Sequence, residues 1–423
     1  MTAPQGGWTR RIALPGGLFT ALLAGAAPAH ADPAPPFAEL VARDAAAPRL
    51  LESEADIRRA QGLAEQARAR LNPTVSLFAE NFAGTSSPYS GLSGVETTLQ
   101  YSQPIERGGK RAARIAAGQA GIEASRARRL ALRVDYAYEL ARAYGDAEVA
   151  GLRVVLVRDE IVQANEDLRI ARALVAAGKE ARLRSLQAQS SVDVLAVDLA
   201  FADATRTAAF ARLSAFAGAD VPYTSLAESL LERPAPSLPA TSPDPLTSPA
   251  YLAALADRRA AELRVTAERR RTVPDITAAG GIRRLEREDA FAAVAGVSIP
   301  LRLYDQNRGN VAAALADVQA ADARLALTRY QAQAVARATG AQVVAADARV
   351  SAAQASFGTA QEAYRLAGIA YTAGKSPLSE LLAARRALGA ARGVVLDALA
   401  ARLQVRARLA QLSGRTILGD PIQ

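Results

Sequence analysis

One long stretch without proline decides the fold, and residues 134–156 within it read VDYAYELARAYGDAEVAGLRVVL. The stretch lies between Pro104 and Pro222, and its only visible break is at Gly178-Lys179. Apolar residues recur every three, four or seven positions, and residues 109–177 are rich in strong helix formers. One helix of that span would be roughly 100 Å long, which is typical of a coiled coil or helical repeat. Its many charges exclude a bilayer span, so the pattern predicts a long helical hairpin.

Residues 1–31 have the features of a secretory signal peptide. Arg10 and Arg11 form a basic start, residues 12–27 are mostly apolar, and AHA at residues 29–31 is a cleavage site. Cleavage would remove the only Met, the only Trp and the only His, and the chain has no Cys. The mature protein would then lack every soft or imidazole ligand. We therefore expect no metal site, and no cysteine that could carry a lipid anchor.

The basic character of the chain does not indicate a nucleic-acid partner. The net charge is +9, but arginines alternate with acids along helical faces, as in residues 158–169. Aromatic residues make up only 5% of the chain, which leaves few stacking platforms for bases. The charges therefore indicate solvated helix surfaces.

Two β-strands are predicted before the long hairpin, at residues 74–82 and 95–103, with a loop rich in Gly, Ser and Pro between them. Segments of about ten residues that alternate in polarity are typical of transmembrane β-strands, and soluble hairpins share the pattern. The second strand alternates between two faces: Val95, Thr97, Leu99 and Tyr101 on one, and Glu96, Thr98, Gln100 and Ser102 on the other.

The second half of the chain repeats the first. Residues 222–249 hold seven prolines and form a crossover that cannot be helical. A helical segment follows, then predicted strands at residues 275–283 and 291–299, and a second long helical stretch broken at Gly374. Gly374 lies as far from Pro300 as Gly178 lies from Pro104. Residues 32–221 and 250–414 therefore read as an internal duplication, followed by a C-terminal tail at 415–423.

Four strands of this length cannot close a membrane barrel, because the smallest known barrels have eight strands. Open sheet edges are not tolerated in lipid, so several protomers would have to share one barrel. The polar strand residues would then line its wet interior: Glu96, Thr98, Gln100 and Arg283.

Short motifs recur around the strands and the helix starts: Asn72-Pro73, Glu80-Asn81-Phe82, Glu96-Thr97-Thr98, Ser102-Gln103-Pro104-Ile105-Glu106, Gly108-Gly109-Lys110-Arg111, Pro274-Asp275, Ser298-Ile299-Pro300-Leu301 and Tyr304-Asp305-Gln306-Asn307-Arg308-Gly309-Asn310. With the duplicated organisation, they resemble the TolC-like outer membrane factors, the exit ducts of tripartite efflux pumps and type I secretion. More narrowly, they resemble the cobalt–zinc–cadmium or copper cation-efflux branch. The resemblance covers essentially all of the mature chain.

The resemblance implies a mainly α fold with a small β part. Long α-helical hairpins would form a periplasmic tunnel below a 12-stranded outer-membrane barrel, to which each protomer of a homotrimer gives four strands. It implies a passive export duct of a Gram-negative outer membrane, not an enzyme, surrounded by outer-membrane lipid. The implied partners are a periplasmic adaptor (membrane fusion protein) and an inner-membrane RND transporter.

Heavy-metal cations are the cargo that the narrower resemblance implies. Two alternatives stay open: drug efflux or type I secretion by the same fold, and a structural periplasmic coiled-coil protein whose strand hairpins are soluble.

In that family the two hairpin tips meet the adaptor and form a closable entrance. The matching residues are Gly178, Lys179, Leu183, Arg184 and Leu186 in the first hairpin, and Gly374, Lys375, Ser376, Glu380, Leu381 and Leu382 in the second. Glycine permits the turn between helices, and we expect the leucines to be exposed apolar contacts for a partner hairpin. Arg184 departs from the acidic residue that the family usually has, which suggests an Arg184–Glu380 pair between neighbouring hairpins.

Neither a nucleotide site nor a catalytic site is predicted. Gly374-Lys375-Ser376 lacks the glycine that a phosphate loop needs at position 369, which is Ile369, and it follows a helix instead of a strand. Without His or Cys in the mature chain, the usual general base and nucleophile are missing. No cofactor-binding residues are expected.

Overall fold

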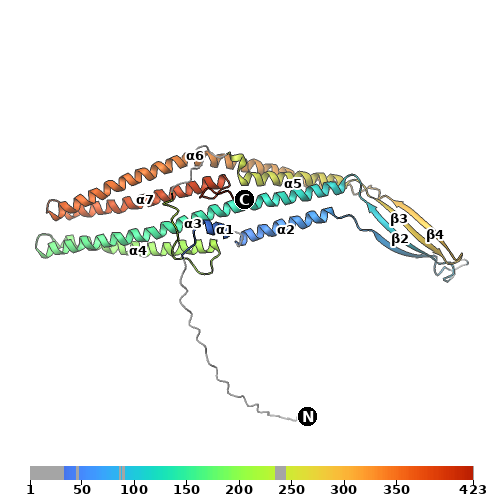
Figure 1. Ribbon diagram of the computed structural model, residues 1–423, viewed down its shortest axis with the longest axis horizontal. Helices are drawn as coiled ribbons and strands as arrows, with labels where there is room; N and C mark the ends of the chain where they lie inside the picture. The colour runs from blue at the N-terminus through green and yellow to red at the C-terminus, as the bar shows by residue number, and fades with distance from the viewer. Residues whose placement is uncertain (1–32, 44–46, 85–86, 88–90, 234–243, 423) are drawn as a thin grey trace, which may run out of the picture.

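The computed structural model describes residues 33–43, 47–84, 87, 91–233 and 244–422, so the predicted signal peptide lies outside it. The molecule is long and narrow, with the strands at one end and two helix-hairpin turns at the other (Figure 1). The first half comprises α1 (Phe37–Ala42), α2 (Pro48–Arg68), β1 (Thr74–Glu80), β2 (Glu96–Ile105), α3 (Lys110–Ala176) and α4 (Arg182–Ala217). The second comprises the 3₁₀ turn η2 (Pro245–Thr247), α5 (Pro249–Arg271), β3 (Ile276–Leu285), β4 (Ala290–Ser298), α6 (Arg308–Thr372) and α7 (Leu378–Leu412).

Two continuous helices set the length of the molecule. α3 has 67 residues and α6 has 65, so each is about 100 Å long, and the single helix predicted for residues 109–177 is confirmed. Toward the tips, α3 packs against α4 and α7, and α7 packs against α6. Toward the strands, α2 and α5 take the places of α4 and α7. No helix of the described part of the chain is long and apolar enough to cross a membrane.

The four strands form one antiparallel sheet in the order β1-β2-β3-β4. Each strand begins and ends within two residues of its predicted bounds. Leu99 of β2 lies opposite Leu77 of β1 and Ile282 of β3, so the three share one face. β1 and β4 each keep one edge without a strand partner among the described residues.

The second long helix begins later than its lack of proline suggests, at Arg308 instead of directly after Pro300. Asn307 adopts a left-handed backbone with φ of 57°, and its backbone N–H donates to Asp305 Oδ1 at 2.9 Å. Its side-chain amide donates to the carbonyl of Glu268 at 2.9 Å. The segment before α6 is therefore a turn tied to the end of α5.

The largest core cluster lies at the middle of the molecule, where α1 and the start of the crossover pack on α3 and α7. The Phe37 ring meets the Tyr144 ring edge-on at 6.0 Å between centroids, and the Tyr144 hydroxyl donates to the carbonyl of Glu228 at 2.8 Å. The buried Glu148 carboxylate accepts the N–H of Leu230 at 2.9 Å and also the Ser229 hydroxyl. Two side chains of α3 thus anchor the beginning of the proline-rich crossover.

Candidate functional site: sheet faces and hairpin tips

The two faces of the sheet differ as the alternation predicts. Leu77, Leu99 and Tyr101 are exposed apolar or aromatic residues on one face. On the other face, Arg283 Nη1 lies 2.8 Å from Glu96 Oε2 and Nη2 lies 3.2 Å from Glu80 Oε2. Arg283 Nε also donates to Thr98 Oγ1 at 3.0 Å. The structure therefore brings together three predicted lumen residues, Glu96, Thr98 and Arg283.

Gln100, the fourth predicted lumen residue, lies apart from this charged group. It is the next position on the polar face of β2, opposite Ser76, and its Nε2 donates to Ser102 Oγ at 3.4 Å. The polar face thus divides into an ion-paired part near the β1–β2 loop and a neutral part nearer the helices.

The two hairpin turns have the same backbone geometry. Gly178 and Gly374 both have φ of 70°, a left-handed conformation that favours glycine. Lys179 N–H donates to the Leu174 carbonyl at 2.9 Å, and Lys375 N–H donates to the Ala370 carbonyl at 2.8 Å. Both are the long bond of a Schellman motif, so each helix ends by the same mechanism.

The expected exposure of the tip leucines is right for the first hairpin and wrong for the second. Leu183 and Leu186 are 59% and 56% exposed, whereas Leu381 and Leu382 are 2% and 8% exposed. Leu381 and Leu382 belong to a buried cluster with Leu168 of α3 and Tyr371 of α6. The physical reason is that α7 lies between α3 and α6, so its apolar stripe is covered within one protomer.

Arg184 contacts its own hairpin. Arg184 Nε lies 3.9 Å from Glu180 Oε2, and its Nη1 donates to Gln187 Oε1 at 3.2 Å. Glu380 of the second hairpin is exposed. The Arg184–Glu380 pair between neighbouring hairpins therefore stays a prediction.

A buried ion pair that the sequence analysis missed joins the two hairpins. Asp167 of α3 and Arg385 of α7 have side chains 5% and 6% exposed, with Arg385 Nε 3.1 Å from Asp167 Oδ2. These two atoms are close, yet neither has a hydrogen bond within the described part of the chain. Burial is the largest effect on Asp167 and raises its pKa to about 6, against the Arg385 charge and a hydrogen bond with Tyr364.

A helical pattern could have revealed this pair. Ala164, Asp167, Leu168 and Ala171 recur at the spacing of a buried stripe and are all buried. An acid on such a stripe needs a partner, because a lone buried charge is costly. Two more polar atoms near the second tip, Tyr371 OH and Ser376 Oγ, are buried without a hydrogen-bond partner among the residues that the structure describes.

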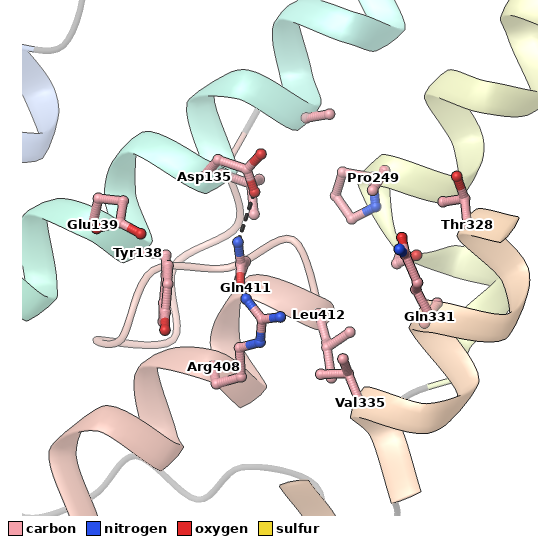
Figure 2. Close-up of a pocket in the computed structure, with 15 residues that line it drawn as sticks. Asp135, Tyr138, Glu139, Pro249, Thr328, Gln331, Val335, Arg408, Gln411 and Leu412 are labelled. Atoms are coloured by element: carbon pink, nitrogen blue, oxygen red, sulfur yellow. Dashed lines mark hydrogen bonds between the residues drawn. The ribbon is translucent and has the colours of Figure 1, made fainter. Parts of the chain in front are cut away.

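A cavity of about 400 Å³ lies at the waist, between α3, the start of α5, α6 and the end of α7 (Figure 2). Gln411 Nε2 donates to Asp135 Oδ1 at 2.6 Å, and Arg408 Nη1 donates to Gln411 Oε1 at 2.6 Å. The Arg408 guanidinium also lies 5.4 Å from the Tyr138 ring centroid. Burial raises the pKa of Asp135, although the Gln411 hydrogen bond opposes it. These groups engage one another, so the lining joins α3 to α7.

Among the residues that the structure describes, there is no group of three or more His, Cys, Asp or Glu side chains that could hold a metal ion.

Comparisons with known proteins identify the family. The family model for outer membrane efflux proteins matches residues 44–219 and 246–415. The chain is 42% identical to the nickel-cobalt-cadmium resistance protein NccC of Alcaligenes xylosoxydans xylosoxydans, over 90% of this chain and 87% of that protein. It is 43% identical to the nickel and cobalt resistance protein CnrC of Cupriavidus metallidurans, over 91% of this chain and 92% of that protein.

The fold is similar to that of a solved outer-membrane protein. VceC from Vibrio cholerae aligns with a TM-score of 0.71 and 19% sequence identity, over 92% of this chain and 97% of that chain. The predicted TolC-like fold, with two long helical hairpins and four strands, is confirmed. The chain belongs to the outer membrane efflux protein family.

Proposed function

We propose that this chain forms the outer-membrane duct of a tripartite efflux system for heavy-metal cations. The observation that carries the proposal is the identity of 42% and 43%, over nine-tenths of the chain, with proteins named for nickel, cobalt and cadmium resistance. The duct is passive, and the adaptor and inner-membrane transporter supply selectivity and energy.

Three copies would complete the duct. Within the described residues of one protomer, the edges of β1 and β4 have no strand partner, and three such sheets would make the 12-stranded barrel. The two outer helices of the layer, α4 and α6, also carry exposed apolar residues. On α4, Val197 and Phe201 are exposed, and on α6, Val344 and Ile369 are exposed. In a closed ring, α4 of one copy would cover α6 of the next.

The polar face of the sheet is better suited to the passage of metal cations than to their tight binding. Arg283 contacts both Glu80 and Glu96, so a cation held by these carboxylates would have to compete with the guanidinium group. We therefore propose that the mature protein binds no transition metal tightly even though metal passes through it. Submicromolar zinc or nickel binding to the purified oligomer, measured by calorimetry, would contradict this.

The hairpin tips are the proposed entrance and adaptor contact. Leu183 and Leu186 carry the apolar part of this surface because they are exposed beside the first turn. Lys179, Lys375 and Glu380 are exposed polar residues at the same end of the molecule. Leu381 and Leu382 support the second tip from inside.

The test of cargo is resistance in a metal-sensitive host that lacks its own duct but keeps the matching adaptor and transporter. We expect the chain to restore growth in nickel, cobalt or cadmium and to leave drug sensitivity unchanged. Restoration of drug resistance without metal resistance would favour the drug-efflux alternative.

The test of the barrel places charges on one face of the sheet. Leu99→Asp with Tyr101→Asp should abolish membrane assembly, because each substitution places a charge against lipid. Such a charge costs about 2–4 kcal/mol for Lys or Arg at the middle of the bilayer, and somewhat less for Asp. The matched control, Gln100→Asp with Ser102→Asp, places the same charges on the polar face. Equal assembly of the two variants, measured by outer-membrane fractionation and heat-modifiable migration, would contradict the facing of the strands.

A further inference from the structure

The basic residues are concentrated where the strands meet the helices. Four segments make up this junction collar: residues 66–73, 104–114, 267–275 and 299–310. The collar contains eleven Lys and Arg residues and four Asp and Glu residues, a net charge of +7 in a chain whose total is +9. Most of the excess positive charge of the protein therefore lies in one band.

Every acid of the collar is engaged within the protomer. Asp275 pairs with Lys110 at 2.7 Å, Glu106 with Arg114 at 2.5 Å and Glu268 with Arg271 at 3.0 Å. The fourth acid, Asp305, accepts a backbone N–H at 2.9 Å. No carboxylate of the collar therefore remains to pair with the other arginines of the collar.

Two more arginines have structural roles. Arg111 Nη2 donates to the carbonyl of Arg68 at 2.7 Å, at the end of α2. Arg302 Nη2 donates to the carbonyls of Arg271 and Val273, just after α5. These guanidinium groups satisfy carbonyls that a helix end leaves free.

Six arginines of the collar remain, and all are exposed. None of their guanidinium groups forms an ion pair with a residue in the described part of the chain. These six are Arg68, Arg70, Arg107, Arg269, Arg270 and Arg308.

Exposed apolar residues lie close in sequence to two of these arginines. Leu301 and Tyr304 are 81% and 97% exposed, and Ile105 ends the apolar face of β2. Arg107 comes two residues after Ile105, and Arg308 four residues after Tyr304. An exposed aromatic and aliphatic band beside cations is the composition of a membrane interface.

The opposite end of the sheet has the reverse charge. Residues 80–96 and 283–290, around the two strand loops, contain three arginines and five acids, a net charge of −2. β2, β3 and β4 have nine or ten residues, and strands of that length tilted in a barrel span about 25 Å, so the collar lies at the periplasmic boundary of the membrane.

We propose that the collar binds the phosphates of anionic phospholipids in the periplasmic leaflet of the outer membrane. Guanidinium groups match phosphate oxygens with paired N–H donors, and an anionic leaflet attracts clustered arginines near its surface. The collar is thus a lipid-binding belt that fixes the depth of the barrel. The proposal rests on the membership of the outer membrane family and not on the identity of the cargo.

The first experiment measures lipid retention by the purified mature oligomer. The protein in neutral detergent is exchanged against phosphatidylglycerol, cardiolipin or zwitterionic phosphatidylcholine, and bound lipid is counted by native mass spectrometry. We expect phosphatidylglycerol and cardiolipin to be retained at least about tenfold better than phosphatidylcholine, and this preference to fall as salt is raised. Equal retention of the three lipids would overturn the proposal.

The second experiment compares matched variants. Replacing Arg70, Arg107, Arg269 and Arg270 by Gln should lower anionic-lipid retention by roughly 100-fold, because each arginine near an anionic surface contributes to attraction. The control replaces four exposed arginines of the helical tube, also free of ion pairs in the described chain: Arg126, Arg329, Arg337 and Arg349. The control should retain lipid as the wild type does. Equal loss in both variants would overturn the proposal.

A third variant separates charge from folding. Replacing the same four collar arginines by Lys should keep only part of the lipid retention, because lysine keeps the charge but lacks the paired N–H donors of the guanidinium group. If the Gln variant retains anionic lipid normally and instead changes the ion selectivity of single channels, the arginines face the lumen and the proposal fails.

Discussion

The α3–α4 and α6–α7 turns share the same hydrogen bonds, yet the helices that follow them bury different residues. Leu183 and Leu186 at the start of α4 are exposed, and Leu381 and Leu382 at the start of α7 are buried. The difference follows from position in the layer. α7 lies between α3 and α6, whereas α4 is at the margin with α3 as its main neighbour.

This contrast shows which part of a duplication is repeated. The turn geometry depends on glycine and local backbone bonds, so it is the same in both halves. Side-chain burial depends on neighbours, and the two halves have different neighbours. The leucines of the second hairpin are therefore part of the protein core, and the leucines of the first hairpin form an exposed apolar surface.

The largest expected effect comes from breaking the ion pair that holds α7 to α3. Arg385→Ala would leave Asp167 buried without its cation, which typically costs about 3–5 kcal/mol. The measurement is the free energy of unfolding of the helical region at pH 7.5, followed by circular dichroism in detergent. Arg386→Ala is the control, because Arg386 is exposed on the next position of the same helix. Equal stability of the two variants would show that the pair does not join the hairpins.

A smaller effect distinguishes the leucines of the two tips. Leu381→Ala should lower the free energy of unfolding by about 2–5 kcal/mol, because it opens a cavity in a packed cluster. Leu183→Ala should change it by less than about 0.5 kcal/mol, since the side chain is already in solvent. Crosslinking to the adaptor should show the reverse order. A large stability loss in Leu183→Ala would contradict the assigned roles.

The strands and turns could be predicted from sequence because their signals are local. Alternation along residues 95–103 fixes both a strand and its two faces, and each glycine break lies at a helix end. The burial of Leu381, in contrast, depends on tertiary packing and not on local sequence. It depends on which helix occupies the middle of the layer, and no residue near the turn carries that information.

The burial of Leu381, Leu382 and Arg385 could nevertheless be predicted from the helical spacing of apolar residues along α7. Leu378, Leu381, Leu382, Arg385 and Leu388 of α7 follow helical spacing and are all buried, so the stripe includes the arginine. On α4, polar residues at 190 and 191 interrupt the row that follows Leu186. The full apolar stripe on α7, which α4 lacks, therefore predicts that the leucines of the second tip are buried and those of the first are exposed.

A further prediction concerns pH and the same ion pair. Burial raises the pKa of Asp167 from 3.8 to about 6, so the folded protein binds the proton more tightly than the unfolded chain. The stability from this group is fully present below pH 3.8 and is lost as pH rises through about 6. Lowering the pH from 7.5 to 5 should therefore stabilise the contact between hairpins by roughly 1 kcal/mol through this group. Asp167→Asn should lose this increment, and an unchanged pH dependence in that variant would contradict the assignment.

The smallest effect tests whether the two turns are equivalent. Gly178→Ala and Gly374→Ala each place a side chain at φ of 70°, which costs about 1 kcal/mol for an alanine. Apart from the adjacent residues, a Cβ at either position would meet no atom of the described chain within 4 Å, so backbone conformation sets the cost. We expect equal losses in the free energy of unfolding, in contrast to the unequal losses at the leucines. If Gly374→Ala costs clearly more than Gly178→Ala, the second turn is held by its buried neighbours as well. The contrast between the tips would then extend from the side chains to the backbone.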